Sequence, residues 1–176
     1  MENKKLLEEI RSYWNNRADG YSRVNQEELH SEQKEKWKEV LLEQLPKKEK
    51  DQVKILDIGT GPGFFAILLA EEGYQVTAVD YTEQMLQEAK SNAADLADQI
   101  SFKRMDAQNL EFPKETFDYI VTRNVTWNLE HPKRAYREWQ RVLKPGGKIL
   151  NFDANWYAYL YDDKLKLGYE QDRQRA

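Results

Sequence analysis

Residues 56–64, Leu-Asp-Ile-Gly-Thr-Gly-Pro-Gly-Phe, are the stretch of this chain that decides its fold. They overlap the end of a short apolar run, residues 53–58, and lead into residues 64–72, whose apolar pattern predicts a helix. Glycine tolerates positive φ and lets a ligand approach the backbone closely. The alternating glycines therefore predict a ligand-binding turn between a strand and a helix.

Two other glycine-rich turns fit this stretch poorly. A P-loop ends in Gly-Lys-Ser or Gly-Lys-Thr, and neither occurs here. A dinucleotide-binding GxGxxG turn needs a glycine where the chain has Phe64, which argues against a nicotinamide-dependent oxidoreductase. The spacing is instead DxGxGxG, from Asp57 to Gly63. A turn that only links strand to helix remains the alternative interpretation.

The rhythm of strand, turn and helix continues through the middle of the chain. Further strands are predicted at residues 74–79, 100–104, 117–122 and 148–152, with helices after Thr82 and at residues 133–143. Alternating strands and helices indicate an α/β fold with a doubly wound, mainly parallel, Rossmann-like sheet. Ligands bind such sheets at the carboxyl ends of the strands, near the point where the strand order reverses.

The same pattern predicts three regions: an N-terminal helical cap at residues 1–50, an α/β core at 51–153 and an aromatic tail at 154–176. Within the cap, the polar segment 15–25 contains Gly20 and is expected to form a loop or a broken helix. The tail indicates a loop or helix rather than strands. The fifth strand is then an open edge, which we expect the tail to cover or a second copy of the chain to pair with as a homodimer.

Composition narrows the choice of partner. The 176 residues are 33% charged with a net charge of −4, and lysines and arginines are scattered among acids, so no basic stripe indicates a nucleic-acid surface. No apolar run suits a membrane span, and the acidic N-terminus does not suit a signal peptide. The lack of cysteine excludes disulfides and suits the cytoplasm, and two histidines exclude a histidine-rich metal site. We therefore expect a small-molecule partner and no metal.

The glycine turn resembles the first motif of class I S-adenosylmethionine (SAM)-dependent methyltransferases, of the small-molecule, methyltransferase domain 11-like type. The resemblance implies that SAM is the cofactor and that the turn holds its amino-acid end. The matching residues are Asp57, Gly59, Thr60, Gly61 and Gly63. Carbonyls and the aspartate suit the ammonium of SAM, whereas backbone amides and the following helix N-terminus suit its carboxylate.

Two later motifs match the same family in order. Asp80 ends the second strand, where a carboxylate accepts both ribose hydroxyls of SAM. Tyr81 and Met85 match residues that cover the adenine, and Asp106 and Ala107 match residues that contact its amino group and ring. A helix N-cap role for Asp80 and core packing for Met85 are the alternatives.

The segment after the fourth strand passes beside the reactive sulfur in similar proteins. The resulting cofactor candidates are Thr122, Arg123 and Asn124. Near the N-terminus, Tyr21 lies in a segment that resembles one closing over the cofactor, although helix anchoring explains it equally well. Trp127 and Asn128 are candidates for facing the substrate, with packing of the wall as the alternative.

The resemblance covers about residues 53–153 and stops before the last two strands of the family's usual seven-stranded sheet. It implies methyl transfer to a small-molecule acceptor by in-line displacement, in which positioning supplies most of the catalysis. The motifs assign no catalytic residue; Asp153, at the end of the fifth strand, is the first candidate for a base and His131 the second. A non-catalytic SAM-binding module or subunit is the alternative function.

Overall fold

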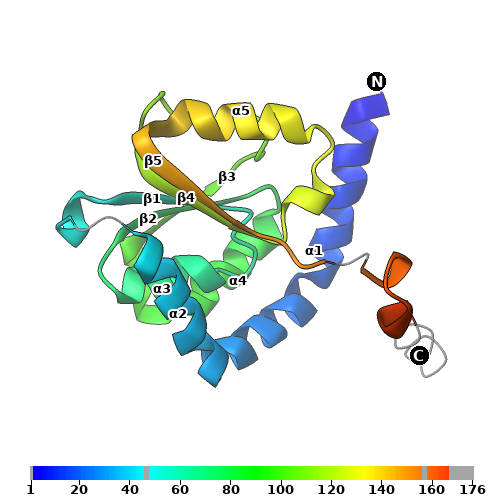
Figure 1. Cartoon of the computed structure of the whole chain (residues 1–176), viewed down its shortest axis with the longest axis horizontal. Coiled ribbons are helices and arrows are strands. Elements are labelled where there is room, and N and C mark those ends of the chain that lie inside the picture. The colour runs from blue at the N-terminus through cyan, green and yellow to red at the C-terminus, as the bar shows by residue number, and fades with distance from the viewer. Residues whose placement is uncertain (1, 46–47, 156–157, 167–176) are drawn as a thin grey trace.

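A parallel sheet with the strand order β3-β2-β1-β4-β5 runs through the centre of the molecule (Figure 1). The computed structural model describes residues 2–45, 48–155 and 158–166. The strands are β1 (Lys54–Ile58), β2 (Gln75–Asp80), β3 (Ile100–Arg104), β4 (Phe117–Arg123) and β5 (Leu143–Phe152). Every neighbouring pair in this sheet is parallel. The predicted α/β fold with a doubly wound, parallel sheet is therefore confirmed.

The strand order reverses at β1, which pairs with β2 on one side and with β4 on the other. Ile58, the last residue of β1, lies opposite Val79 of β2 and Thr122 of β4. The loops that leave these three strands diverge from one point at the carboxyl edge. This is the position where open parallel sheets bind ligands.

Helices cover both faces of the sheet, as Figure 1 shows. One face carries α2 (Glu32–Gln44), α3 (Phe64–Glu71) and α4 (Glu83–Ala93), and the other carries α5 (Pro132–Val142). The first core includes Leu41, Phe65 and Ala93, and the second is built around Trp139, which is fully buried. α3 is buried along almost its whole length, and this burial holds the preceding glycine turn against the sheet.

The predicted break at residues 15–25 is wrong, because α1 is one continuous helix from Glu2 to Leu29. Ala18, Ser22 and Asn25 are buried at helical spacing on the side that meets the body of the protein. A glycine inside a helix costs about 1 kcal/mol, which tertiary packing readily outweighs. The sequence signal of Gly20 is local, whereas the packing that overrides it is not.

The fifth strand begins earlier than predicted and has an irregular start. Its register against β4 shifts between Phe117 and Tyr119, and the extra residues include Gly146 and Gly147. Gly146 has φ +79°, and a Cβ on Gly147 would lie 2.7 Å from the Asp118 carbonyl oxygen. Glycines therefore suit both positions of this bulge.

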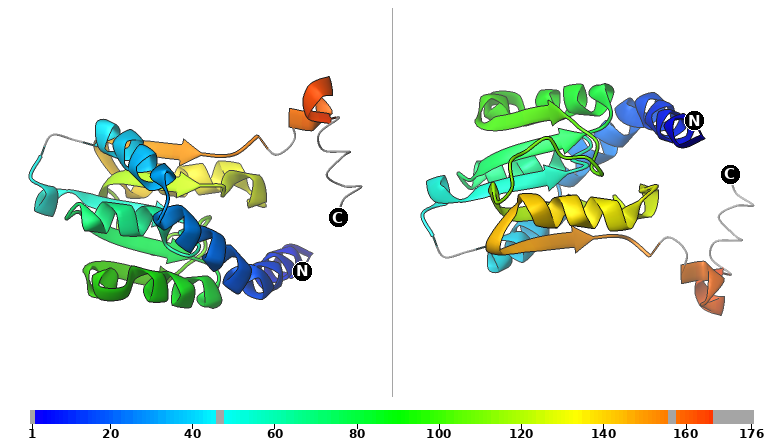
Figure 2. Two further views of the ribbon diagram at one scale, coloured as in Figure 1. Left: turned by 90° about the horizontal axis from the view of Figure 1, so that it is seen from below. Right: turned by 90° about the horizontal axis from the view of Figure 1, so that it is seen from above.

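The free edge of β5 is not covered by the described part of the tail. Residues 158–166 contain the short 3₁₀ helix η4 (Ala158–Leu160) and no strand. They lie beyond the carboxyl end of β5 rather than along its edge (Figure 2). The expectation that the tail covers this edge is therefore wrong for these residues, while Trp156 and Tyr157 lie outside the described residues. None of the described helices has an apolar stretch that suits a bilayer crossing.

Candidate active site

The glycine turn is a tight backbone loop between β1 and α3. Gly59, Gly61 and Gly63 have φ values of +64°, +52° and +95°, which residues with a side chain rarely adopt. A Cβ on Gly59 would lie 2.4 Å from Cγ2 of Val125, whereas a Cβ on Gly61 would meet only Cε1 of Tyr21, at 3.7 Å. Gly59 is thus required for close packing against the loop after β4, and Gly61 leaves its backbone open to a ligand.

Asp57 lies behind this turn and holds it in place. Its Oδ2 atom accepts hydrogen bonds from the Thr60 hydroxyl, at 2.6 Å, and from the Ala66 amide of α3, at 3.1 Å. The side chain is 2% exposed, and this burial raises the pKa of Asp57 to about 7 although both hydrogen bonds oppose the rise. Asp57 therefore couples the turn to α3, and its carboxylate is not part of the cleft wall.

Asp80 ends β2 beside the turn and is half-buried. Its Oδ2 atom accepts from the Gly61 amide at 3.0 Å, and its Oδ1 atom accepts from the Thr82 amide at 2.8 Å. Burial raises the pKa of Asp80, and these backbone hydrogen bonds lower it in part. The Thr82 side chain and the Tyr81 backbone also form hydrogen bonds with this carboxylate, which lines the cleft. Thr82 precedes α4 as predicted, but its side chain makes no capping hydrogen bond.

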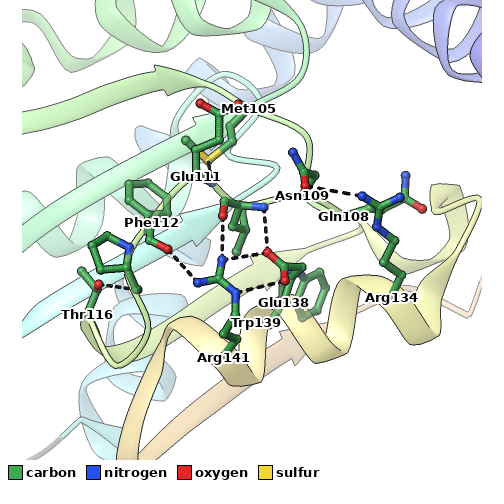
Figure 3. Close-up of polar contacts among 12 residues, drawn as sticks. Met105, Gln108, Asn109, Glu111, Phe112, Thr116, Arg134, Glu138, Trp139 and Arg141 are labelled. Atoms are coloured by element: carbon green, nitrogen blue, oxygen red, sulfur yellow. Dashed lines mark hydrogen bonds and ion pairs between the residues drawn. The ribbon is translucent and has the colours of Figure 1, made fainter.

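The loop after β3 is clamped onto α5, as Figure 3 shows. The Arg141 guanidinium donates to the carbonyl oxygens of Leu110 and Phe112, both at 2.7 Å. It also donates to Glu138, whose carboxylate accepts from the Leu110 amide at 3.2 Å. The hydrogen bond from Arg141 holds the pKa of Glu138 below its usual value. Both side chains therefore work as one clamp on the loop backbone.

The cleft end of the same loop is fixed by two further contacts from the α5 side. The Trp139 indole donates to the Ala107 carbonyl oxygen at 2.8 Å, and the His131 amide donates to Oε1 of Gln108 at 2.6 Å. Asp106 accepts the Gln108 amide through Oδ1 at 2.8 Å. Asp106, Ala107 and Gln108 all line the cleft. This arrangement presents the Asp106 carboxylate next to the backbone of Ala107.

At the end of β4, Arg123 and Asn124 also line the cleft, but their polar groups already have partners. The Arg123 guanidinium forms a two-bond ion pair with Glu28 of α1, at 2.8 and 2.9 Å, and packs 4.9 Å from the Trp37 ring. Asn124 has φ +57°, and its Oδ1 accepts from the Ala154 amide at 2.9 Å. Arg123 therefore ties α1 to the sheet instead of offering a free charge, and Thr122 is fully buried.

α1 forms the roof of the cleft through side chains from four of its turns. Leu7, Ile10, Trp14 and Tyr21 all line it. Tyr21 lies near Gly61, and Tyr81 donates from its hydroxyl to Glu8 at 3.3 Å. The space beneath α1, counted together with the solvent that it opens to, is about 800 Å³.

The cleft brings together most of the residues predicted for cofactor binding. Those that line it are Tyr21, Gly59, Gly61, Asp80, Tyr81, Met85, Asp106, Ala107, Arg123 and Asn124. Asp57, Thr60, Gly63 and Thr122 are not among the lining residues. The lining residues missed from the sequence are Leu7, Ile10, Thr82, Met105, Gln108, Val125 and Leu129. Leu7 and Ile10 stand at helical spacing, and such a stripe indicates core packing as readily as a roof.

The candidates for a base lie outside the cleft lining. Asp153 is exposed and accepts hydrogen bonds from the Thr126 hydroxyl and, at 3.1 Å, from the Asn151 side chain. His131 is exposed at the start of α5, with Glu130 3.6 Å from its ring nitrogen. No cluster of three metal-ligating side chains occurs within the described residues.

Comparison with known proteins identifies the site. Residues 56–151, more than half of the chain, match the family of methyltransferase domains. The chain belongs to this family. The methyltransferase domain spans β1 to β5, so all strand ends at the cleft lie within the matched region. The expected resemblance to SAM-dependent, small-molecule methyltransferases is confirmed.

Two curated methyltransferases are similar in sequence to this chain. A ubiquinone biosynthesis O-methyltransferase from Coxiella burnetii is 31% identical over 109 residues, which cover 61% of this chain and 47% of that protein. A ubiquinone/menaquinone biosynthesis C-methyltransferase from Rickettsia massiliae is 31% identical over 144 residues, covering 77% of this chain and 54% of that protein. The chain thus spans about half the length of these curated relatives.

A solved structure supports the same assignment of the fold. A protein from Methanococcus maripaludis, assigned as an S-adenosyl-L-methionine-dependent methyltransferase, superposes with a TM-score of 0.71 at 26% identity. The match covers 80% of this chain and 64% of that one. The fold, the family and the SAM-dependent class therefore agree with one another.

Proposed function

We propose that this methyltransferase domain binds SAM in the cleft beneath α1 and transfers its methyl group to a small-molecule acceptor. The observation that carries the proposal is the meeting of Gly61, Asp80 and Asp106 around one cleft, from three successive strand ends. A glycine turn, a ribose-binding carboxylate and an adenine-binding carboxylate in this order match the parts of one adenosyl ligand.

Each part of SAM has a complementary group in the cleft. The open backbone at Gly61 and the N-terminus of α3 favour the carboxylate of its amino-acid end. The Asp80 carboxylate at the cleft wall suits the ribose hydroxyls, and Oδ2 of Asp106 suits the adenine amino group. Tyr81 and Met85 offer apolar surface for the adenine ring. Asp57 acts indirectly, because it holds the turn that these contacts need.

For methyl transfer, the protein mainly has to align the acceptor atom with the methyl carbon and the sulfur of SAM. SAM supplies an electrophilic methyl group: a lone pair of the acceptor forms the new bond to carbon, and the electrons of the broken carbon–sulfur bond stay on sulfur. A proton lost by the acceptor passes to water. Among the described residues, the ionisable side chains that line the cleft are Asp80, Asp106, Arg123 and the phenols of Tyr21 and Tyr81. We therefore assign catalysis to proximity and orientation rather than to a general base, including Asp153.

Two measurements test the proposal. Calorimetric titration should give binding of SAM and of S-adenosylhomocysteine and no binding of NAD. Incubation with methyl-labelled SAM and a pool of metabolites should then yield a labelled product. Binding without transfer would support a non-catalytic SAM-binding module, and failure to bind SAM would refute the proposal altogether.

Two finer parts of the proposal concern assembly and location. The free edge of β5 has unpaired backbone groups that a second copy of the chain can pair with, so a homodimer through this edge is part of the proposal. Light scattering across a concentration series tests it by measuring the molar mass. A chain without cysteine suits a reducing compartment, so we place the protein in the cytoplasm, which fractionation of expressing cells checks.

A further inference from the structure

The cleft has two halves of different chemistry. The strand-end half contains Asp80 and Asp106 and suits the adenosyl ligand described above. A second group of lining residues comes from α1 and from the segment after β4, and Val125 of this group also packs beside Gly59. We name it the acceptor wall; its residues are Ile10, Trp14, Val125, Asn128 and Leu129.

The acceptor wall has no charged side chain among the described residues that form it. The nearest cation in the chain sequence, Arg123, has both terminal nitrogens bonded to Glu28. Glu8 of the roof is paired with Arg11 and receives the Tyr81 hydroxyl. The polar groups of the wall are the Asn128 amide and the indole N–H of Trp14, and both are uncharged. A charged group placed here would lose its hydration without gaining an ionic partner.

The wall is also bordered by aromatic rings. The Trp14 ring lies 5.6 Å from that of Tyr21 and 6.2 Å from that of Trp127, in both cases edge to face. Tyr21 and Trp127 remain 40% and 42% exposed. Exposed aromatic surface gathered at a cleft is typical of a ligand site, because a flat apolar ligand buries it and stacks against it.

From this charge-free aromatic wall we infer the class of the acceptor: its reacting part is an uncharged, flat, ring-bearing molecule. The inference rests on the proposed function and specifies the substrate of the same cleft. The ring packs against Trp14 and Leu129, and one polar substituent bonds to the Asn128 amide. Acceptors with an ammonium, carboxylate or phosphate at the reacting end are disfavoured, since the wall has no counter-charge for them.

Three size-matched probes separate these classes: 2-naphthol is neutral, 2-naphthoate is anionic and 2-naphthylmethylammonium is cationic. Each is titrated into the protein saturated with S-adenosylhomocysteine, and binding is followed by calorimetry and tryptophan fluorescence. We expect 2-naphthol to bind at least about tenfold more tightly than either charged probe, because only these must leave water unpaired. Equal or tighter binding of a charged probe would overturn the inference.

Three variants locate the binding. Trp14→Leu should weaken 2-naphthol binding about tenfold, and Asn128→Asp should shift the preference toward the ammonium probe about fivefold or more, through a new charge-assisted hydrogen bond. Val40→Ala, on the exposed side of α2, is the matched control and should change neither. Unchanged naphthol binding in Trp14→Leu would also overturn the inference. Binding of S-adenosylhomocysteine is measured separately for every variant, so failure of the cofactor site is distinguished from failure of the acceptor wall.

Discussion

Replacement of Asp80 tests the most specific contact assigned to the cleft. Its two oxygens accept backbone amides, at 3.0 Å from Gly61 and 2.8 Å from Thr82, and the carboxylate lines the cleft where we place the ribose. A hydrogen bond to a charged group contributes about 1.5–3 kcal/mol. Asp80→Asn keeps one acceptor oxygen and loses the second, so one ribose contact is lost. We expect the dissociation constant for S-adenosylhomocysteine to rise about 10- to 150-fold.

The assay compares two ligands so that damage to the fold cannot imitate the effect. S-Adenosylhomocysteine and its 2′,3′-dideoxy analogue are titrated by calorimetry into the wild type and into Asp80→Asn. The variant should lose affinity for the first ligand and little for the second, which has no hydroxyl to lose. Equal losses for both ligands, or no loss in a folded variant, would refute the ribose assignment.

The pH dependence of the same titration gives a second readout. Burial raises the pKa of Asp80 in the free protein, and the ribose hydroxyls bind the ionised form. Affinity should therefore fall as the pH drops through this raised pKa. Asp80→Asn should abolish that part of the pH dependence, because an amide does not titrate in this range.

Three further predictions concern the framework around the cleft. Gly59→Ala should lower the free energy of unfolding by about 2–4 kcal/mol in denaturant titrations, from its left-handed φ and the clash with Val125, whereas Gly20→Ala, with nothing within 4 Å, should raise it by about 0.5–1 kcal/mol. Burial raises the pKa of Asp57 to about 7, so the stability that its protonated form contributes is complete below about pH 4 and is lost as the pH rises through 7. The free energy of unfolding is measured for the wild type and for Asp57→Asn across this pH window. The difference between the two free energies should change by roughly 4 kcal/mol at most, and a constant difference would contradict the raised pKa. Arg141→Leu should lower the free energy of unfolding by about 2–4 kcal/mol and weaken S-adenosylhomocysteine binding, because the loop backbone loses its hydrogen bonds to the guanidinium. Arg141→Lys should retain part of the stability and part of the affinity. Thermal melting measures the first quantity and calorimetry the second.

Local pattern was enough to predict the sheet and the centre of the cleft. Parallel strands of a doubly wound sheet all end at the same edge, so acids placed directly after β2 and β3 had to approach the glycine turn. Asp80 and Asp106 were predicted from this rule together with the family resemblance, and both line the cleft. Such predictions succeed because they depend on residues a few positions from a strand end.

The features that the sequence did not reveal depend on distant contacts. Arg123 was predicted as a cofactor residue, but its guanidinium pairs with Glu28, 95 positions earlier in the chain. The glycine at position 20 predicted a break that packing of α1 overrides. Asp57 was expected to face the ammonium of SAM, whereas its bonds to Thr60 and Ala66 turn it toward α3. No spacing rule gives the direction of a side chain whose partner lies on another element.

The two ends of α1 are held with unequal strength. Toward its carboxyl end, Ala18 and Ser22 are buried, Gln26 donates to Asn92 at 2.7 Å, and the Glu28 carboxylate is bonded to Arg123. Toward its amino end, exposed side chains such as Leu6 alternate with the cleft lining. The Tyr81 hydroxyl donates to Glu8 at 3.3 Å and joins this end to the sheet side.

From this asymmetry we expect ligands to enter the cleft by movement of the amino-terminal half of α1. The half of α1 with fewer buried contacts opens at lower free energy. We therefore predict that amides of residues 6–14 exchange with deuterium faster than those of residues 21–29 in the free protein. Saturation with S-adenosylhomocysteine should slow exchange at residues 6–14 the most, since the ligand packs against that half. Exchange that is uniform along α1, or unaffected by the ligand, would contradict a roof that opens at its amino end.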